Sequence, residues 1–494
     1  MSSNFQKSGT NALLLAQSKV ITLLLSMATT MILARTLSLD EYGTYSELLT
    51  ISSIAVSIFS LGLPNALNYF LPRCQGTDEK RKFIGFYFIL ITVLSVVLMG
   101  AMVCCNHAIA TYYDNPHLIT YSYFLIIVPW TKLIISSRSN LLVAEGYVVR
   151  ETVYAIANGL LLAVIATLTI INQANFDIYI GLYVVVECLF AGLVYVEAYR
   201  ISEKKIKINI DWNAIKELLK YTIPLGLSTA VSTINLDLDK LIIGAVMDET
   251  SVAVYANAGK ELPFSLISTS FTAIFLPQIV LLIKDKKIDG AVKRWKDIML
   301  INYIILVFCV AASIVFAPQI ISLLYSEAYL DGVGIFRIYS LTLLLRITYW
   351  AMILNAYGRT KEILYNSVAC LAINVCLNDL LYNLIGFTGP AYATIISIFA
   401  IAALQIVRTS KLLKISVRQI IPFKQFILPT VACVVSGVAV WLITHFSNIS
   451  TGRNGILMAM AIGIVWAGIY FFIFGKKILA LWRNLNQDIQ NKEV

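Results

Sequence analysis

Charged residues inside long apolar runs are the residues of this sequence best placed to do chemistry. The deepest of them are three bases, Arg346, Lys19 and Lys260, and two acids, Glu187 and Asp237. A charge at the centre of a bilayer costs at least about 2.5 kcal/mol, so such side chains face a partner or a water-filled cavity. Guanidinium and ammonium groups suit an anionic ligand such as a diphosphate. A deep carboxylate can instead bind and release a coupling ion as its surroundings change.

Two aromatic residues extend the first candidate. Tyr349 and Trp350 follow Arg346 by three and four positions, so in a continuous helix the three side chains share one face. That face suits a sugar or a cation–π contact. We therefore predict that these residues, with Lys19 and Lys260, line a cavity for an anionic head group. The structural alternative is an Arg346 that pairs with an acid of a neighbouring helix.

The two acids, Glu187 and Asp237, are the predicted sites of ion coupling because they lie deepest among the carboxylates. Four further charged residues are less central candidates: Lys132, Lys240, Glu261 and Asp379. Lys132 lies near a helix end, so its ammonium group can instead extend to the membrane interface. Asp237 and Lys240 are three residues apart on one helix face and can neutralise each other.

The composition indicates that lipid surrounds the elements that carry these charges. Of the 494 residues, 59% are hydrophobic and only 13% are charged. Soluble domains contain about 25% charged residues. So few charged residues cannot cover a globule of this size, which excludes a soluble enzyme.

Fourteen apolar runs are long enough to cross a membrane as helices, which takes about 20 residues each. They fall at 12–34, 44–70, 83–104, 118–135, 152–172, 178–199, 222–245, 253–282, 298–317, 337–358, 363–383, 390–407, 426–446 and 455–474. The predicted fold is therefore an all-α, polytopic membrane protein.

The basic residues between these runs predict the orientation of the chain. With the N-terminus inside, thirty of the 38 basic residues fall in inner segments and three in outer ones. Cytoplasmic segments of membrane proteins carry such an excess of Lys and Arg. Both termini are therefore predicted to be cytoplasmic. The net charge of +10 is a topology signal and not a sign of nucleic-acid binding.

Three pairs of segments repeat at a nearly constant spacing. Residues 32–48 match 242–258, Phe70-Leu71-Pro72-Arg73 matches Phe275-Leu276-Pro277-Gln278, and Ala144-Glu145-Gly146 matches Ala356-Tyr357-Gly358. The spacing spans six helices, so two six-helix repeats share one orientation in the membrane. The predicted parts are an N-terminal half (1–200), a cytoplasmic amphipathic linker (201–221), a C-terminal half (222–407), a cytoplasmic loop (408–425), and two appended helices with a cytoplasmic tail (426–494).

Cysteine and histidine give no sign of a metal site or a bound cofactor. Most of the eight cysteines lie inside apolar runs, and the three histidines have no ligand spacing. The sequence also lacks a Gly-rich phosphate-binding loop, which argues against direct use of ATP.

The segment 34–54 carries a family pattern. It reads ARTLSLDEYGTYSELLTISSI, with the basic residue Arg35, the acidic Asp40 or Glu41, and a small-x-Tyr step that ends at Tyr45. The segment NYFLPR and the small-residue-plus-Gly ends of the fourth and tenth runs fit the same pattern. Together they resemble the polysaccharide flippases, the O-antigen, capsule and teichuronic-acid branch of the multidrug/oligosaccharidyl-lipid/polysaccharide exporter superfamily. The likeness extends over the first twelve predicted helices.

The resemblance implies a transporter and not an enzyme. It would flip an undecaprenyl-pyrophosphate-linked oligosaccharide to the outer leaflet of a bacterial inner membrane by alternating access, for O-antigen, capsule or lipopolysaccharide synthesis. The implied partners are this lipid, the membrane, and the polymerase and chain-length proteins of the same pathway. Two alternatives are a cation-coupled multidrug antiporter of the same superfamily and a membrane polysaccharide polymerase. Fourteen helices and the deep basic residues favour the flippase.

Overall fold

The computed structural model describes residues 2–171, 176–203, 205, 212–260, 262–447 and 449–490. Side chains are not described at 2–13, 16, 169–171, 212–214, 273, 274, 277, 360 and 486–490. Every regular element within the described residues is a helix, as the sequence predicts.

The helices of the N-terminal part are α1 (Ser2–Thr36), α2 (Leu39–Phe59), α3 (Leu63–Phe70), η1 (Leu71–Arg73), α4 (Thr77–Tyr113), α5 (His117–Thr120), α6 (Ser122–Ala144), α7 (Val148–Ile171), α8 (Phe176–Ile201), α9 (Trp212–Val246) and α10 (Glu249–Ala258). Those that follow are α11 (Ser265–Lys284), α12 (Ile288–Val315), α13 (Ala317–Leu324), η2 (Glu327–Gly332), α14 (Val333–Leu345), α15 (Met352–Ala356), α16 (Thr360–Ile385), η3 (Gly386–Thr388), α17 (Gly389–Leu413), α18 (Val417–Ile420), α19 (Phe423–Phe446) and α20 (Arg453–Gln490).

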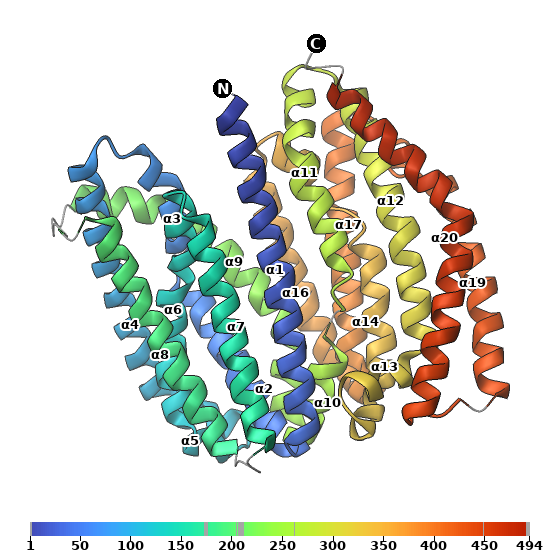
Figure 1. Cartoon of the computed structure of the whole chain (residues 1–494), viewed down its shortest axis with the longest axis horizontal. Helices are drawn as coiled ribbons and strands as arrows, with labels where there is room; N and C mark the ends of the chain where they lie inside the picture. The colour runs from blue at the N-terminus through green and yellow to red at the C-terminus, as the bar shows by residue number, and fades with distance from the viewer. Residues whose placement is uncertain are drawn as a thin grey trace. The chain divides into compact units, whose positions relative to one another are not determined.

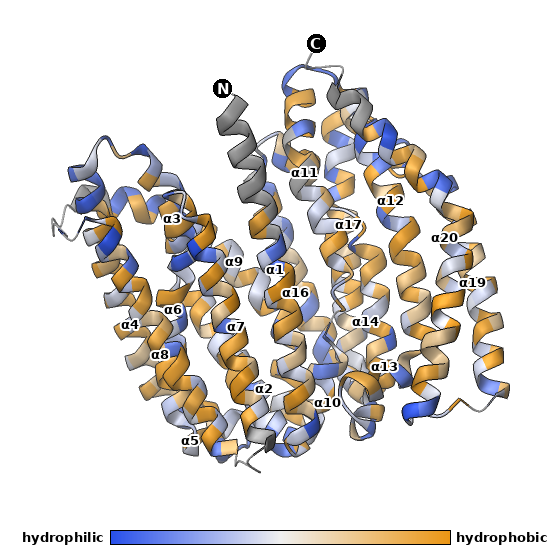
Figure 2. Cartoon of the chain, viewed as in Figure 1, coloured by the Kyte–Doolittle hydropathy of each residue, from blue (hydrophilic) through white to orange (hydrophobic). Residues whose placement is uncertain are grey.

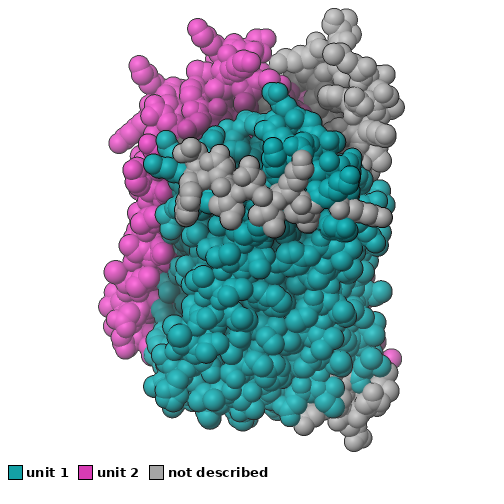
Figure 3. Space-filling model, turned by 90° about the vertical axis from the view of Figure 1, so that its left-hand side faces the viewer, with its two compact units in different colours: residues 1–253 teal, residues 254–494 magenta. Residues whose placement is uncertain are grey.

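The chain divides into two compact units, Met1–Ala253 and Val254–Val494 (Figure 3). In unit 1, α1 packs against α7, α6 against α4 and α8, and α2 against α9. In unit 2, α16 packs against α17, and α12 packs against α14, α19 and α20 (Figure 1). The division assigns α9 to unit 1, whereas the predicted C-terminal half begins at residue 222. The predicted linker helix lies partly outside the described residues, and its described part forms the beginning of α9.

The helices carry hydrophobic residues along their lengths and hydrophilic residues mostly near their ends (Figure 2). Among the described residues, nine helical stretches are long and apolar enough to cross a membrane, or ten if the bent pair α2–α3 is one span. One of these stretches, Lys361–Leu413, contains both α16 and α17. Helix α6 carries two charged residues and α9 carries six, which lowers their hydropathy. The count of fourteen therefore stays a prediction.

Three predicted spans are interrupted. The predicted helix 44–70 is split into α2 and α3, which are bent by 48°. Gly62 lies at the bend with a φ of +69°, and a Cβ atom there would lie 2.5 Å from the Thr222 carbonyl oxygen. The bend therefore depends on a close approach of α3 to α9 that a glycine permits.

The other two interruptions split the predicted helices 253–282 and 337–358. Helix α10 ends at Ala258 and α11 begins at Ser265, with Pro263 between them. A proline disfavours the helical conformation of the residue before it and removes a backbone donor. Helix α14 ends at Leu345 and α15 begins at Met352, so Arg346 ends a helix and does not lie in the middle of one.

The predicted inner and outer segments group as expected within unit 1. At one end, ion pairs join the segments around residues 78–82, 138–151 and 197–203: Lys80–Glu145, Arg81–Glu203, Arg138–Glu151 and Arg150–Glu197. At the other end, Asn115 donates to Glu47, and Tyr121 donates to Asp177. Which end faces the cytoplasm stays a prediction.

The first repeated segment has the same local structure in both copies. Helices α1 and α9 end 210 residues apart, at Thr36 and Val246, and α2 and α10 begin at the same spacing. Each second helix is capped by the residue before it. The Ser38 hydroxyl accepts from the Glu41 amide at 3.2 Å, and the Asp248 carboxylate accepts from the Ser251 amide at 3.0 Å.

The third repeated segment also matches in conformation. Helices α6 and α15 end at Ala144 and Ala356, and each is followed two residues later by a glycine with positive φ, +80° at Gly146 and +69° at Gly358. Both ends then close with the 6→1 hydrogen bond of a Schellman motif, at 2.7 and 2.9 Å. The second pair differs because Phe70 ends α3, whereas Phe275 lies inside α11. Two matches of three support the duplication, and the six-helix repeat stays a prediction.

Candidate functional site

Glu187 and Lys132 form an ion pair in unit 1 between a buried acid and a partly exposed base. Glu187 lies on α8 with a side chain only 2% exposed, and the Lys132 ammonium on α6 is 3.3 Å from its Oε1. The same ammonium lies 5.5 Å from the centre of the Tyr183 ring. Burial of a carboxylate without a partner is costly, so the pair satisfies Glu187. The sequence predicted both residues as candidates but did not pair them.

Asp237 and Lys240 also pair. The Lys240 ammonium lies 2.7 Å from Asp237 Oδ1 on the same face of α9. The contact shows that the two side chains neutralise each other, as the structural alternative predicted. Asp239, which is 3% exposed, lies beside them and accepts from the Lys240 amide. Helix α9 therefore carries a small cluster of three charges, and its role in ion coupling stays a prediction.

Arg346 lies half-buried where α14 ends, so the helical face predicted for Arg346, Tyr349 and Trp350 does not form. Tyr349 and Trp350 are half-buried and pack against a hydrophobic cluster of unit 2. The Trp350 indole donates to the carbonyl of Leu345, the last residue of α14, at 2.5 Å. Trp350 therefore caps the helix end beside Arg346.

Helix α12 holds the interruption after Arg346 in place. The Trp295 indole donates to the Thr348 hydroxyl at 2.8 Å, and the Asn302 amide donates to the Ile347 carbonyl at 2.8 Å. Both donor residues are fully buried. In lipid, non-helical backbone is tolerated where protein groups or water satisfy it, and in transporters such interruptions occur at binding sites. The non-helical segment 346–351 is therefore stabilised by specific hydrogen bonds from α12.

The remaining predicted residues are more exposed. Lys19 is exposed on α1, Lys260 is exposed just after α10, and Asp379 is exposed on α16, where the Asn383 amide contacts it. Glu261 lies outside the described residues. The assignment of Lys19 and Lys260 to a substrate cavity stays a prediction.

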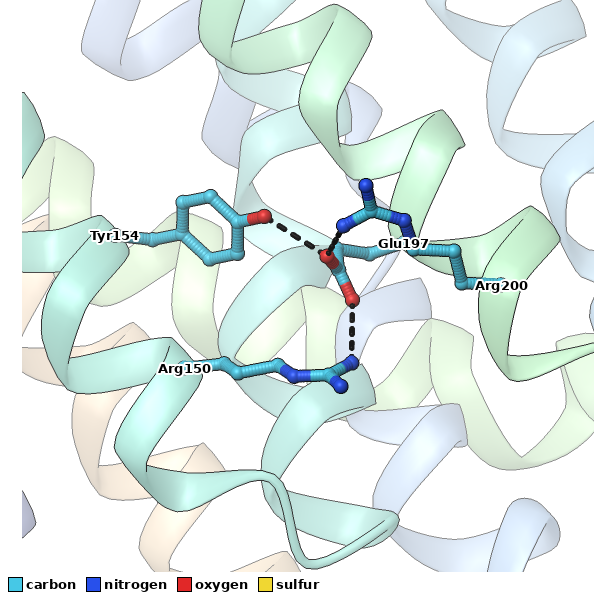
Figure 4. Close-up of polar contacts among 4 residues, drawn as sticks. All are labelled: Arg150, Tyr154, Glu197 and Arg200. Carbon is cyan, nitrogen blue, oxygen red and sulfur yellow. Dashed lines mark hydrogen bonds and ion pairs between the residues drawn. The ribbon is translucent and has the colours of Figure 1, made fainter.

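A carboxylate held by two arginines closes one end of the α7–α8 pair (Figure 4). Glu197, whose side chain is 1% exposed, accepts from Arg200 at 2.9 Å and from the Tyr154 hydroxyl at 2.8 Å, both on Oε1. Its other oxygen accepts from Arg150 at 3.3 Å. We call these four residues the Glu197 clamp.

Unit 2 has a similar clamp at the same spacing along the sequence, with the acid and the base exchanged between the two helices. Glu362, near the start of α16, accepts from Arg359 at 3.3 Å and from Arg408 on α17 at 3.4 Å. Glu362 follows Arg150 by 212 residues, and Arg408 follows Glu197 by 211. The acid therefore lies on the second helix of the pair in unit 1 and on the first helix in unit 2.

Sequence reasoning missed both clamps because it treated their arginines only as topology signals. The reversal of charge at the repeat spacing was a signal that could have found them. It also missed Glu47 on α2, which is 2% exposed and accepts from the Asn115 amide at 2.7 Å. Asn115 is itself fully buried and also donates to Thr44, at 3.1 Å.

A buried polar seam between α16 and α17 was missed for another reason. Asn374, Asn378 and Thr394 are at most 5% exposed, and the Asn378 amide donates to the Asn374 side-chain oxygen at 2.8 Å. These side chains carry no charge, so a search for intramembrane charges passes over them.

The carboxylate of Asp248, which caps α10 at the α9–α10 junction, is stabilised in its ionised form. Hydrogen bonds from Ser251, and then from Thr250, hold the pKa of Asp248 below its ordinary value of 3.8. The carboxylate therefore stays charged at the N-terminus of α10, where the helix dipole favours a negative charge. Within the described residues, no group of three or more His, Cys, Asp or Glu side chains could hold a metal ion.

Comparison with known proteins identifies the relatives of this chain. Residues 32–334 match the family model described as polysaccharide biosynthesis protein. An uncharacterized membrane protein of Methanocaldococcus jannaschii is 25% identical over 398 residues, which cover 76% of this chain and 92% of that protein. The capsular polysaccharide biosynthesis protein CapF of Staphylococcus aureus is 25% identical over 151 residues, 30% of this chain and 38% of CapF.

Solved structures share the fold. The lipid II flippase MurJ in an inward closed conformation matches with a TM-score of 0.76 at 16% identity, over 94% of this chain and 100% of MurJ. An inward-facing multidrug resistance MATE family transporter of the MOP superfamily matches with a TM-score of 0.62 at 15% identity, over 80% of this chain and 96% of that one. The fold is therefore that of polytopic membrane transporters.

Proposed function

We propose that this chain, which belongs to the polysaccharide biosynthesis protein family, flips a polyprenyl-pyrophosphate-linked oligosaccharide from the cytoplasmic to the outer leaflet of a bacterial inner membrane. The observation that carries the proposal is the coincidence of two likenesses. The family match covers more than half of the chain, and a lipid flippase has the same fold along nearly all of it. Export of a surface polysaccharide needs a step that moves the lipid-linked unit outward.

Arg346 is the residue we assign to the diphosphate. Its side chain is half-buried beside an interrupted helix, and its planar guanidinium can bind two phosphate oxygens at once. A partly hydrated guanidinium needs to lose only part of its water to bind an anion. Transport proceeds by alternating access, and Glu187 and Asp237 are the carboxylates we assign to ion coupling. Both have a basic partner, so each can lose or regain an ion pair as its surroundings change.

A multidrug antiporter is the second candidate function. The likeness in fold to the MATE transporter supports this function. That match covers 80% of this chain, however, whereas the match to the flippase covers 94%. A polymerase that joins the repeat units is a third candidate. The face of the membrane on which the substrate accumulates in cells without an active protein distinguishes a polymerase from a flippase.

The test is export in cells that lack this chain and carry variants of it. We expect Arg346→Ala to abolish export while the protein remains in the membrane, and Arg346→Lys to restore it in part. Single lipid-linked repeat units should accumulate on the inner face of the membrane. Accumulation on the outer face would indicate a polymerase instead. Arg453→Ala, at the outer end of α20, is the control and should export normally.

A further inference from the structure

An apolar groove of about 450 Å³ lies in unit 2, between α12, α14 and α19. Its floor is α12, where Val307 and Val310 are almost fully buried. Its walls are α14 and α19, where Leu341, Val434 and Val438 are 40–59% exposed. In a membrane protein, such a groove opens to lipid tails, so its natural occupant is a hydrocarbon chain.

One end of the groove carries a cation and an interfacial aromatic residue. Arg337 is the only charged residue among those that line it, and its Nε donates to the Ile314 carbonyl at 3.1 Å. This hydrogen bond holds the guanidinium at this end of the groove, which we call the mouth. Arg337 forms no ion pair with the described part of the chain. Trp441 lines the groove on α19, and tryptophan is enriched at the level of lipid head groups.

The mouth lies at the end of unit 2 that is predicted to face outward. There, Gln319 and Ser322 donate to the backbone carbonyls of Ile449 and Thr451, which joins the segment after α12 to the loop between α19 and α20. Helix α14 begins at this end, so Arg337 lies in its first turns. Thr430 and Val307 lie at the other end of the groove, deeper along the helices.

We propose that this groove is a phospholipid site, in which one acyl chain of an anionic phospholipid of the outer leaflet lies between α12, α14 and α19 and its phosphate contacts Arg337. The lining residues on α19 run from Thr430 to Trp441, about 16 Å along a helix. That is about half of the ~30 Å hydrocarbon core, the depth that one phospholipid acyl chain spans. A polyprenyl chain is several times longer, so most of it would remain outside.

The chain offers a matched pair of variants for the test. Val434 lines the groove and is 59% exposed, and its neighbour Val435 is 66% exposed and does not line it. The full chain is reconstituted into vesicles of equimolar phosphatidylglycerol and phosphatidylcholine. One lipid at a time carries a photoreactive group at the end of an acyl chain. Crosslinked peptides are then located and counted.

We expect labelled phosphatidylglycerol to crosslink to residues 307–315, 337–344 and 430–441. Val434→Trp should reduce this labelling at least five-fold, and Val435→Trp should leave it unchanged. Arg337→Gln should remove the preference for phosphatidylglycerol over phosphatidylcholine. Three outcomes would overturn the proposal: labelling that Val434→Trp does not change, a head-group preference that survives Arg337→Gln, or displacement of phosphatidylglycerol by a stoichiometric amount of polyprenyl phosphate. The last would assign the groove to the polyprenyl chain.

Discussion

The Glu197 clamp can be tested by charge reversal, because the corresponding contact of unit 2 shows the reversed arrangement of acid and base. Unit 2 carries the same contact with acid and base exchanged between the helices, as Glu362 and Arg408. The pair Arg150→Glu and Glu197→Arg gives unit 1 that polarity. We expect the double variant to be more stable than either single reversal, because it restores one attractive pair.

The structure sets the size of these effects. Loss of one partner of a buried ion pair costs about 3–5 kcal/mol. That range applies where a buried charge is left unpaired, whereas Glu197→Ala removes the buried charge itself and leaves arginines that are 49% and 58% exposed and stay hydrated. We therefore expect a smaller loss, about 1.5–3 kcal/mol, from the hydrogen bonds to the carboxylate. Arg150→Ala leaves Glu197 with Arg200 and Tyr154, so it should cost about 1 kcal/mol or less.

Charge reversal should cost more than truncation. Two unit charges about 4 Å apart near a protein surface interact by about 4 kcal/mol, so Glu197→Arg turns strong attraction into repulsion. In the double variant we expect a coupling free energy of about 2 kcal/mol or more in favour of the pair. The buried position of Glu197 has less room for an arginine than the 38% exposed position of Arg408, so rescue is expected to be partial.

The assay is unfolding of the purified chain in detergent by heat and by denaturant. Reversal of the exposed Lys82–Asp78 pair, whose side chains are about half exposed, is the control. It should change stability by about 1 kcal/mol or less, most of it because Asp78 lies in the first turn of α4. A double variant that unfolds as easily as Glu197→Arg alone would refute the reasoning. The clamp would then depend on the shape of the Glu197 site and not on pairing.

Three further predictions concern other parts of the chain. Asn115→Ala removes the amide that donates to the buried Glu47 and should destabilise the protein by roughly 1–3 kcal/mol in the same unfolding assay; Thr92→Val, at a half-buried hydroxyl on α4, should cost less. The pKa of Asp248 is lowered in the folded protein, so its carboxylate should stabilise the cap of α10 at pH values above 3.8, the ordinary pKa, and lose this effect as the pH falls further. Asp248→Asn should remove this pH dependence. Asp248→Ala should cost about 1 kcal/mol of stability at neutral pH. Cysteine labelling should find the segment 284–297, which joins α11 to α12 and includes the start of α12, in the cytoplasm. Labelling from outside would overturn the predicted orientation.

Sequence predicted best what depends on local composition. Apolar runs predicted the helices because a backbone in lipid must satisfy its own hydrogen bonds. The pair Asp237–Lys240 was expected because three residues along a helix bring side chains together. The helix ends at Gly146 and Gly358 were also readable, since glycine adopts positive φ without strain.

What depends on distant partners could not be predicted in the same way. The segment 346–351 departs from helix where Trp295 and Asn302, about fifty residues earlier, bind its backbone and side chains. Likewise, Lys132 and Glu187 are separated by 55 residues, and nothing in either run indicates the other. Burial of Glu197 depends on the packing of α7 against α8, which hydropathy does not describe.

Flipping by the purified chain in proteoliposomes is the most direct test of the proposed function. A polyprenyl-pyrophosphate-linked saccharide is placed in one leaflet, and its appearance in the other is measured with a saccharide-binding protein that cannot cross the membrane. We predict that the saccharide appears with the intact chain, that Arg346→Ala prevents its appearance, and that phosphatidylcholine in the same vesicles is not flipped. Vesicles that carry the intact chain and expose no more saccharide than protein-free vesicles would contradict the proposal, as would equal flipping of phosphatidylcholine.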